Sequence, residues 1–282
     1  MGLRINTNVP SLIAQRNLRT TRGSLDRTLE RLSSGSRINH AGDDAAGLAI
    51  SESLKAQLRG IGQAERNAQD GISLVQVAEG AMAEVSNILV RMRELGVQAA
   101  SDTVGDQERK FLNVEFTQLM EEIDRIANST EYNRTPLLNG NAHVFEIQIG
   151  TRNNPSVDRV KLFDAASTDI NPVALGLNMA SVGDKTSAQN SLASIDSAIG
   201  SVTSIRAEFG AMQNRLQSIV SGLMISKENL AAANSRIRDA DIAEEMSELT
   251  KNQILMQSGI SVLGQANTTI KNAPNILNGG QG

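Results

Sequence analysis

The chain has 282 residues, of which 40% are hydrophobic, which is enough for one or two modest domains with a core. Aromatic residues make up only 2%, so the buried area has to come from many aliphatic and small side chains, as in long helices packed side by side. The absence of cysteine excludes disulfides, thiolate metal sites and cysteine nucleophiles. The net charge is −4, and acidic and basic residues are interspersed along the chain, so nothing in the sequence suggests a nucleic-acid partner.

Catalytic, metal and membrane signals are also weak. The two histidines, His40 and His143, are far apart and neither stands in HExxH spacing. Asp43 and Asp44 lack a third carboxylate at loop spacing, so we expect them to cap a helix rather than bind a metal. No window approaches ~18 continuous apolar residues, and the N-terminus lacks the apolar region of a Sec signal. We therefore expect a protein that is not an enzyme and has neither a cofactor nor a membrane partner. We also expect it to be soluble when made, and any export would use a route other than the Sec signal.

The first amphipathic pattern covers 10–33 and begins with Pro10, a residue suited to the first turn of a helix. Its apolar side has four leucines: Leu18, Leu25, Leu29 and Leu32. Its polar side is rich in arginine, which indicates either a solvated face or pairing with Glu244, Glu245 and Glu248 near the C-terminus.

The longest pattern covers 45–100, where two rows of residues each recur every seven positions. One row runs from Leu54 to Gly96 and the other from Gln57 to Ala99. This spacing predicts a long rod, about 80 Å at ~1.5 Å per residue.

A shorter helix and a strand region follow. Spacings of three and four predict an antiparallel return helix over 105–128, and Pro136 with Asn139-Gly140 predicts a chain reversal after it. The period then changes to two in 144–150, and a second short strand is expected around 160–163. We expect one or two small hairpins packed on helix surface.

Helical spacing resumes over 186–237, which predicts a second rod of nearly the same length as the first. The seven-residue phase breaks between Ile237 and Ile242, so a joint is expected at 238–241. The last helix then presents an apolar seam, whose larger members are Ile242, Met246, Leu249, Met256, Ile260 and Leu263. The seam has to be covered by the chain's own N-terminus, by another copy, or by both.

These elements predict a mainly α fold of long antiparallel helical rods, with coiled-coil terminal helices and a small β-hairpin region. The two ends of the chain, 1–42 and 239–282, would form one coiled-coil domain. The remaining 43–238 would form a rod domain, with the short variable hairpin region at 140–185.

Three segments resemble bacterial flagellin: LSSGSRINHAGDDAAGLAIS at 32–51, AERNAQDGISLVQVAEGAM at 64–82, and SRIRDADIAEEMSELTKNQILMQSGISVLGQAN at 235–267. The resemblance implies a subunit of the extracellular flagellar filament that is exported unfolded through a type III apparatus and polymerises under a cap. The terminal helices would form the inner domain and be covered by each other and by neighbouring subunits. Because only 140–185 stands where larger members have outer domains, the chain resembles a minimal form.

The resemblance also implies partners besides other copies of the chain, namely the cap, hook-associated proteins, an export chaperone and a Toll-like receptor of animals. Four residues match receptor-contact positions of the family: Arg91, Leu95, Gln98 and Glu115. The alternative for the same stretch is that Leu95 simply packs and that Arg91 and Glu94 make subunit contacts. The tail NAPNILNGGQG lacks the Leu-Leu ending that many family members present to the chaperone.

Two other functions compete with the filament subunit. The hook–filament junction protein has similar termini, although the DADIAEE and QILMQSGISVLGQAN matches favour flagellin. An enzyme borne on the filament would need a catalytic insert, and 140–185 contains only His143 and no HExxH.

Overall fold

The computed structural model describes residues 7–141, 144–162 and 168–271. Within these residues, five helices and four short strands follow one another in the order α1, α2, α3, β1, β2, β3, β4, α4, α5. Contacts divide the chain into two compact units: residues up to Ala56 with those from Leu230 on, and Gln57–Asn229 between them. This division falls inside α2 and α4, whereas the sequence-based division into 1–42 with 239–282 and 43–238 follows the breaks between helices.

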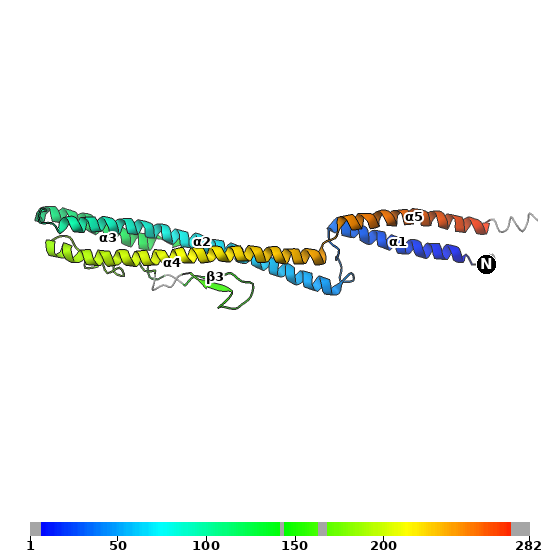
Figure 1. The fold of residues 1–282 in the computed structure, drawn as a ribbon, viewed down its shortest axis with the longest axis horizontal. Coiled ribbons are helices and arrows are strands. Elements are labelled where there is room, and N and C mark those ends of the chain that lie inside the picture. The colour runs from blue at the N-terminus through cyan, green and yellow to red at the C-terminus, as the bar shows by residue number, and fades with distance from the viewer. Residues whose placement is uncertain (1–6, 142–143, 163–167, 272–282) are drawn as a thin grey trace, which may run out of the picture. The chain divides into compact units, whose positions relative to one another are not determined.

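In the first unit, α1 (Val9–Ser34) and α5 (Ile242–Lys271) lie side by side (Figure 1). Asn8 begins α1 by accepting a hydrogen bond from the Ser11 amide at 3.0 Å, with Pro10 in the first turn. Gly35 ends it in the left-handed conformation at φ 66°, which glycine adopts without strain. Helices predicted over 10–33 and from Ile242 onward are thus confirmed.

The second unit contains most of α2 (Ala45–Ala99) and α4 (Lys185–Arg238), together with α3 (Asp106–Ser129). Cross-helix ion pairs show that α4 runs antiparallel to α2: Arg93 pairs with Asp196 at 2.7 Å, and Glu65 with Lys227 at 3.0 Å. The turn between α2 and α3 is closed by the buried Arg109, which donates to the carbonyls of residues 99 and 101. The predicted rods and return helix are confirmed within a residue or two.

The core of the second unit follows the two heptad rows predicted for α2. From Ile61 onward, every member of both rows is buried, including Met82, Leu89 and Met92 at 0% exposure. Phe116 of α3 and Ile195 of α4 complete this core and are also fully buried. Seven-residue spacing holds these side chains on one face of a long helix, so the sequence pattern and the buried surface coincide.

Two small antiparallel sheets lie in the second unit. The pair β3 (Glu146–Gln148) and β4 (Arg159–Lys161) matches the predicted hairpin and packs over Gly71 of α2, where an added Cβ would lie 3.4 Å from side-chain atoms of Ile147 and Leu162. Phe163, predicted on the second strand, lies outside the described residues.

The second sheet, β1 (Glu131–Tyr132) with β2 (Thr135–Pro136), was not predicted as strands. Asn133 and Arg134 form its two-residue turn with φ of 50° and 64°. Two consecutive positive φ values are typical of the tight hairpin turn whose twist suits flanking strands. The turn was predicted over 131–140 from Pro136 and Asn139-Gly140, so the reversal lies within the predicted segment but at Asn133-Arg134, with a short strand on either side.

Candidate assembly surface

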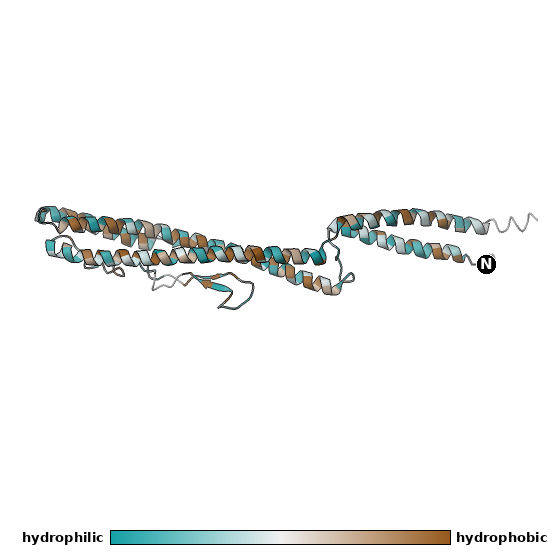
Figure 2. Ribbon diagram, in the orientation of Figure 1, coloured by the Kyte–Doolittle hydropathy of each residue, from teal (hydrophilic) through white to brown (hydrophobic). Residues whose placement is uncertain are grey.

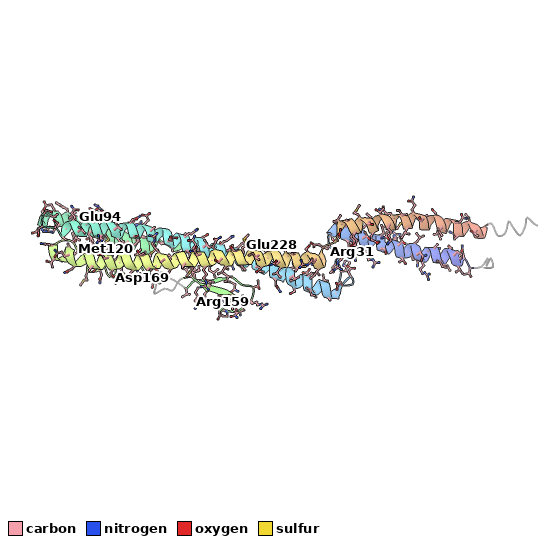
Figure 3. All side chains as sticks on the ribbon, viewed as in Figure 1. Arg31, Glu94, Met120, Arg159, Asp169 and Glu228 are labelled. Carbon is pink, nitrogen blue, oxygen red and sulfur yellow. The ribbon has the colours of Figure 1, made fainter. Side chains whose placement is uncertain are left out.

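Helices α1 and α5 pack against each other but leave large apolar side chains exposed. The two helices run antiparallel, since contacts at one end join Asn8 Nδ2 to the carbonyl oxygen of Ala266 at 3.1 Å, and Ser11 Oγ to Asn267 Oδ1 at 3.0 Å. At the other end, Arg31 Nη1 lies 3.1 Å from Glu245 Oε1. Arg31 lies on α1 at this end (Figure 3). This ion pair confirms one of the predicted arginine–glutamate contacts, and the Glu245 side chain is only 11% exposed.

We call the surfaces where the helices meet the pairing face. On α1 it consists of positions spaced alternately by three and four: Ser11, Ala14, Leu18, Thr21, Leu25, Thr28 and Leu32. On α5 it consists of Glu245, Leu249, Asn252, Met256, Gly259, Leu263 and Ala266. The spacing is that of a coiled coil, yet the fully buried members are mainly small or polar, and the larger apolar members are only half-buried.

The predicted seam is divided by this arrangement. Six of its residues are half-buried in the pairing face: Leu18, Leu25, Leu32, Leu249, Met256 and Leu263. The other four are exposed: Leu29 at 47%, Ile242 at 53%, Met246 at 48% and Ile260 at 59%. About half of each of these four side chains is therefore not covered by the chain itself.

The second row of the α5 pairing face lies one residue before the row expected from the sequence. Glu245, Asn252, Gly259 and Ala266 occupy it, in place of Met246, Gln253, Ile260 and Asn267. Glu245 was predicted as a partner for an arginine of α1, but Asn252, Gly259 and Ala266 were missed because a row of small and polar side chains has no apolar signal. The only available clue is their regular seven-residue spacing beside the Leu249–Met256–Leu263 row.

Further large apolar side chains join the exposed part of the seam on the outside of the pair. We call this set the outer apolar residues: Val9, Leu12, Ile13, Leu29, Ile242, Met246, Ile254, Leu255, Ile260 and Val262. Hydrophobic residues accordingly recur along α5 in Figure 2. Each is between 45% and 60% exposed. Single exposed apolar residues are ordinary, but ten large apolar side chains left exposed on one helix pair, whose fully buried positions are small or polar, indicate a surface that another chain covers.

The segment after α1 is tied down by backbone contacts to the end of α4. Ser36 and Asp239 form an isolated antiparallel bridge, and the Arg37 amide donates to the carbonyl of Arg238 at 2.6 Å. Ile38 beside them is only 1% exposed. The break predicted at 238–241 is thus a short joint between α4 and α5 that is bonded to the 35–38 segment.

Asp43 and Asp44 were both predicted to cap the next helix, but only Asp44 does so, because Asp43 instead closes the turn before α2. Asp44 Oδ1 accepts from the Gly47 amide at 2.8 Å, a capping contact. Asp43 Oδ2 accepts from the amides of Asn39 and His40, and these hydrogen bonds, that from His40 foremost, lower the pKa of Asp43. The described residues hold no cluster of three or more His, Cys, Asp and Glu that could bind a metal.

The residues predicted for a receptor surface lie on α2 and α3 in the second unit. Arg91 spans the two helices, with Nη2 2.8 Å from Glu115 Oε1, and Nη1 3.0 Å from Glu94 Oε2. Bonds to these two carboxylates raise the pKa of Arg91, Glu115 more than Glu94. Gln98 is exposed. Leu95 differs, because its side chain is 0% exposed inside the core, so the predicted alternative that Leu95 packs is the one observed.

None of the described helices is both long and apolar enough to cross a membrane. The exposed apolar side chains of α1 and α5 are interspersed with charges and polar groups, as in helices that associate with other helices.

Comparisons with known proteins place these features in a family. The model of the bacterial flagellin N-terminal helical region matches residues 5–143, and that of the C-terminal helical region matches 192–277. Flagellin of Halalkalibacterium halodurans is 45% identical over 263 residues, covering 93% of this chain and 95% of the relative. The flagellar filament 33 kDa core protein of Treponema phagedenis is 40% identical over 288 residues, covering 97% of this chain and 99% of the relative.

Solved structures agree with this relationship. The crystal structure of Bacillus cereus flagellin aligns with a TM-score of 0.50 and 33% identity, over 60% of this chain and 94% of that chain. A putative flagellar hook-associated protein from Vibrio parahaemolyticus aligns with a TM-score of 0.58 over 70% of this chain and 100% of that one, but at 16% identity it shares only the fold. The heptad rods, the paired terminal helices and these matches show that the chain belongs to the bacterial flagellin family.

Proposed function

We propose that the chain is a structural subunit that is secreted and polymerises with copies of itself into the bacterial flagellar filament. The observation that supports this most directly is the burial pattern of α1 and α5. Their pairing face buries Ser11, Thr28 and Glu245, while Ile254 and Val262 on the outside are about 60% exposed. Neighbouring copies covering the outer apolar residues would bury this area, and the gain offsets the entropy of ordering the terminal helices.

The relatives favour the filament over the hook–filament junction. Those that match nearly the whole chain at about 40% identity are named flagellins or filament core proteins. The hook-associated structure matches at 16% identity, which supports a shared fold and no more. An extracellular location, an export chaperone, the cap and hook-associated partners belong to the same proposal and follow from the family. The tail expected to bear on chaperone binding lies outside the described residues.

An innate-receptor surface is a narrower part of the proposal. Arg91, Gln98 and Glu115 would form it, since all three have accessible side chains and two of them are joined by an ion pair. Leu95 would support the surface from beneath.

Truncation tests the filament proposal. Variants lacking 1–35 or 242–282 are expected to lose polymerisation while the second unit remains folded, because its core uses no residue of the removed segments. Seeded polymerisation followed by electron microscopy measures the first effect, and circular dichroism with thermal unfolding measures the second. Filaments formed by either truncated variant would contradict the proposal.

A further inference from the structure

One close approach stands out in the pairing face. A Cβ built at Gly259 of α5 would lie 2.8 Å from Cδ2 and 3.2 Å from Cγ of Leu18 on α1. Carbon atoms in packed proteins do not come that close, so Leu18 occupies space that any other residue at 259 would need. At the observed helix separation, the position accepts only a hydrogen as its side chain unless Leu18 moves.

A second glycine on the same helix shows that this contact is particular to Gly259. Gly264 has no atom within 4 Å of where its Cβ would be. Each glycine weakens a helix by about 1 kcal/mol relative to alanine. At Gly264 nothing in the structure opposes an alanine, whereas at Gly259 an alanine requires the Leu18 side chain to move.

The Leu18–Gly259 contact lies between the hydrogen bonds and the ion pair that fix the ends of the pair. Asn8 with Ala266 and Ser11 with Asn267 lie on one side of it, and Arg31 with Glu245 on the other. Separating the helices at this contact strains polar bonds of about 3 Å at both ends. The contact therefore lies where a change in helix separation affects the polar bonds at both ends of the pair.

We propose that Gly259 is a positioning residue for assembly. By admitting Leu18 it fixes the separation and register of α1 and α5, and thereby the direction in which the outer apolar residues face a second copy of the chain. Ile260, the next residue, is 59% exposed and lies about 100° further around the helix. A turn or shift of α5 that relieves a clash at 259 moves Ile260 with it. This inference rests on the proposed function as a filament subunit.

The test compares Gly259→Ala with the matched control Gly264→Ala in seeded polymerisation, reading the critical concentration. Gly259→Ala is expected to raise it about tenfold or more, which is about 1.4 kcal/mol per subunit. Gly264→Ala is expected to leave the critical concentration unchanged or to lower it, because alanine favours the helix more than glycine does and meets no neighbouring atom there. Gly259→Leu and Gly264→Leu repeat the comparison with a side chain too large for rotation of Leu18 to accommodate.

Rescue separates positioning from a general loss of folding. Leu18→Ala removes the atoms that a methyl group at 259 would meet, so the Leu18→Ala/Gly259→Ala variant is expected to polymerise better than Gly259→Ala alone. Equal polymerisation of Gly259→Ala and wild type, or simple addition of the two single effects, would overturn the inference. Circular dichroism of each variant checks that the second unit is still folded.

A failure of the proposed function is recognised separately. If wild type and Gly264→Ala both fail to polymerise on seeds, the filament proposal is wrong, and the positioning role is then judged on the pair alone. The chain has no cysteine, so Ser11→Cys with Asn267→Cys introduces the only two thiols. Their disulfide is expected to form at least about tenfold more slowly when Gly259→Ala is added, in line with the same clash. An unchanged rate, or no disulfide in either background, would overturn the inference.

Discussion

The two compact units share the seven-residue spacing of apolar residues but differ in how much of that apolar surface the chain itself buries. In Gln57–Asn229 the heptad rows of α2 meet α3 and α4, and side chains such as Leu89 and Phe116 are 0% exposed. In the α1–α5 pair the face between the helices buries Ser11 and Glu245, and apolar residues such as Ile254 stay 60% exposed. A heptad pattern therefore predicts helix packing without saying whether the partner is in the same chain.

The difference has an energetic consequence. Burying one large aliphatic side chain contributes about 1.5–3 kcal/mol. The central unit obtains this contribution on folding, while the outer apolar residues of the terminal pair can obtain it only by association. Folding of the central unit should accordingly be independent of subunit concentration, and ordering of the terminal pair should depend on it.

The largest effect expected from this comparison is in the core of the central unit. Phe116→Ala removes a fully buried ring and is expected to lower the free energy of unfolding by about 3–5 kcal/mol. Phe111, on the same helix α3, is 65% exposed, so Phe111→Ala is expected to change it by less than ~0.5 kcal/mol. Urea unfolding followed by circular dichroism measures both. Similar losses for the two variants would show that α3 is not packed as described.

Sequence analysis located the elements of the fold well because burial in the central unit follows apolar spacing. Both α2 rows, the return helix and the joint before Ile242 were predicted from period alone. A turn was predicted over 131–140, but strands β1 and β2 were not, because they are two residues long and the positive φ at Arg134 has no signal in its residue type.

The candidate assembly surface was predicted less completely. Leu249, Met256 and Leu263 were placed in the seam and Glu245 was predicted as an arginine partner, but Asn252 and Gly259 were not predicted to face α1. Hydrophobic periodicity cannot identify a row whose members pack by being small or by forming an ion pair. Nor can one sequence tell which apolar row meets its own chain and which meets another.

A second prediction concerns the outer apolar residues. Ile260→Ser is expected to leave the free energy of unfolding of the monomer within ~0.5 kcal/mol, since Ile260 is already 59% exposed and serine has a similar helix propensity. The same change is expected to raise the critical concentration for polymerisation by roughly 10- to 100-fold, because burial against a neighbour is lost. Sedimentation of seeded filaments at graded concentrations measures this effect.

Ile260→Val is the control for that variant, since it keeps an apolar side chain and is expected to polymerise nearly as well as wild type. If Ile260→Ser polymerised at the wild-type critical concentration, this part of α5 would not be an interface. If Ile260→Ser destabilised the monomer instead, the terminal pair would bury more of the Ile260 side chain within its own chain than the 59% exposure indicates.

The smallest effect is expected from acid, and it compares one carboxylate in each unit. The pKa of Asp184 is lowered mainly by hydrogen bonds from Ser187 at the start of α4, and that of Asp43 mainly by the amides of His40 and Asn39. A lowered pKa in the folded state means that the stabilisation is present above the unfolded value of ~4 and is lost as pH falls through the folded value. Thermal unfolding should thus be unaffected by these groups near neutrality and should decline below about pH 4.

Asparagine at either position keeps an oxygen that accepts the same hydrogen bonds but does not titrate. Asp184→Asn is expected to reduce the acid dependence of the main unfolding transition, because Asp184 belongs to the unit with the core. Asp43→Asn is expected to leave that transition unchanged and to alter only the acid dependence of polymerisation, since the 35–44 segment belongs to the terminal unit. If Asp43→Asn shifted the main transition as much as Asp184→Asn, the two units would unfold together. The terminal pair would then be ordered in the monomer, and its ordering would not depend on association with other subunits.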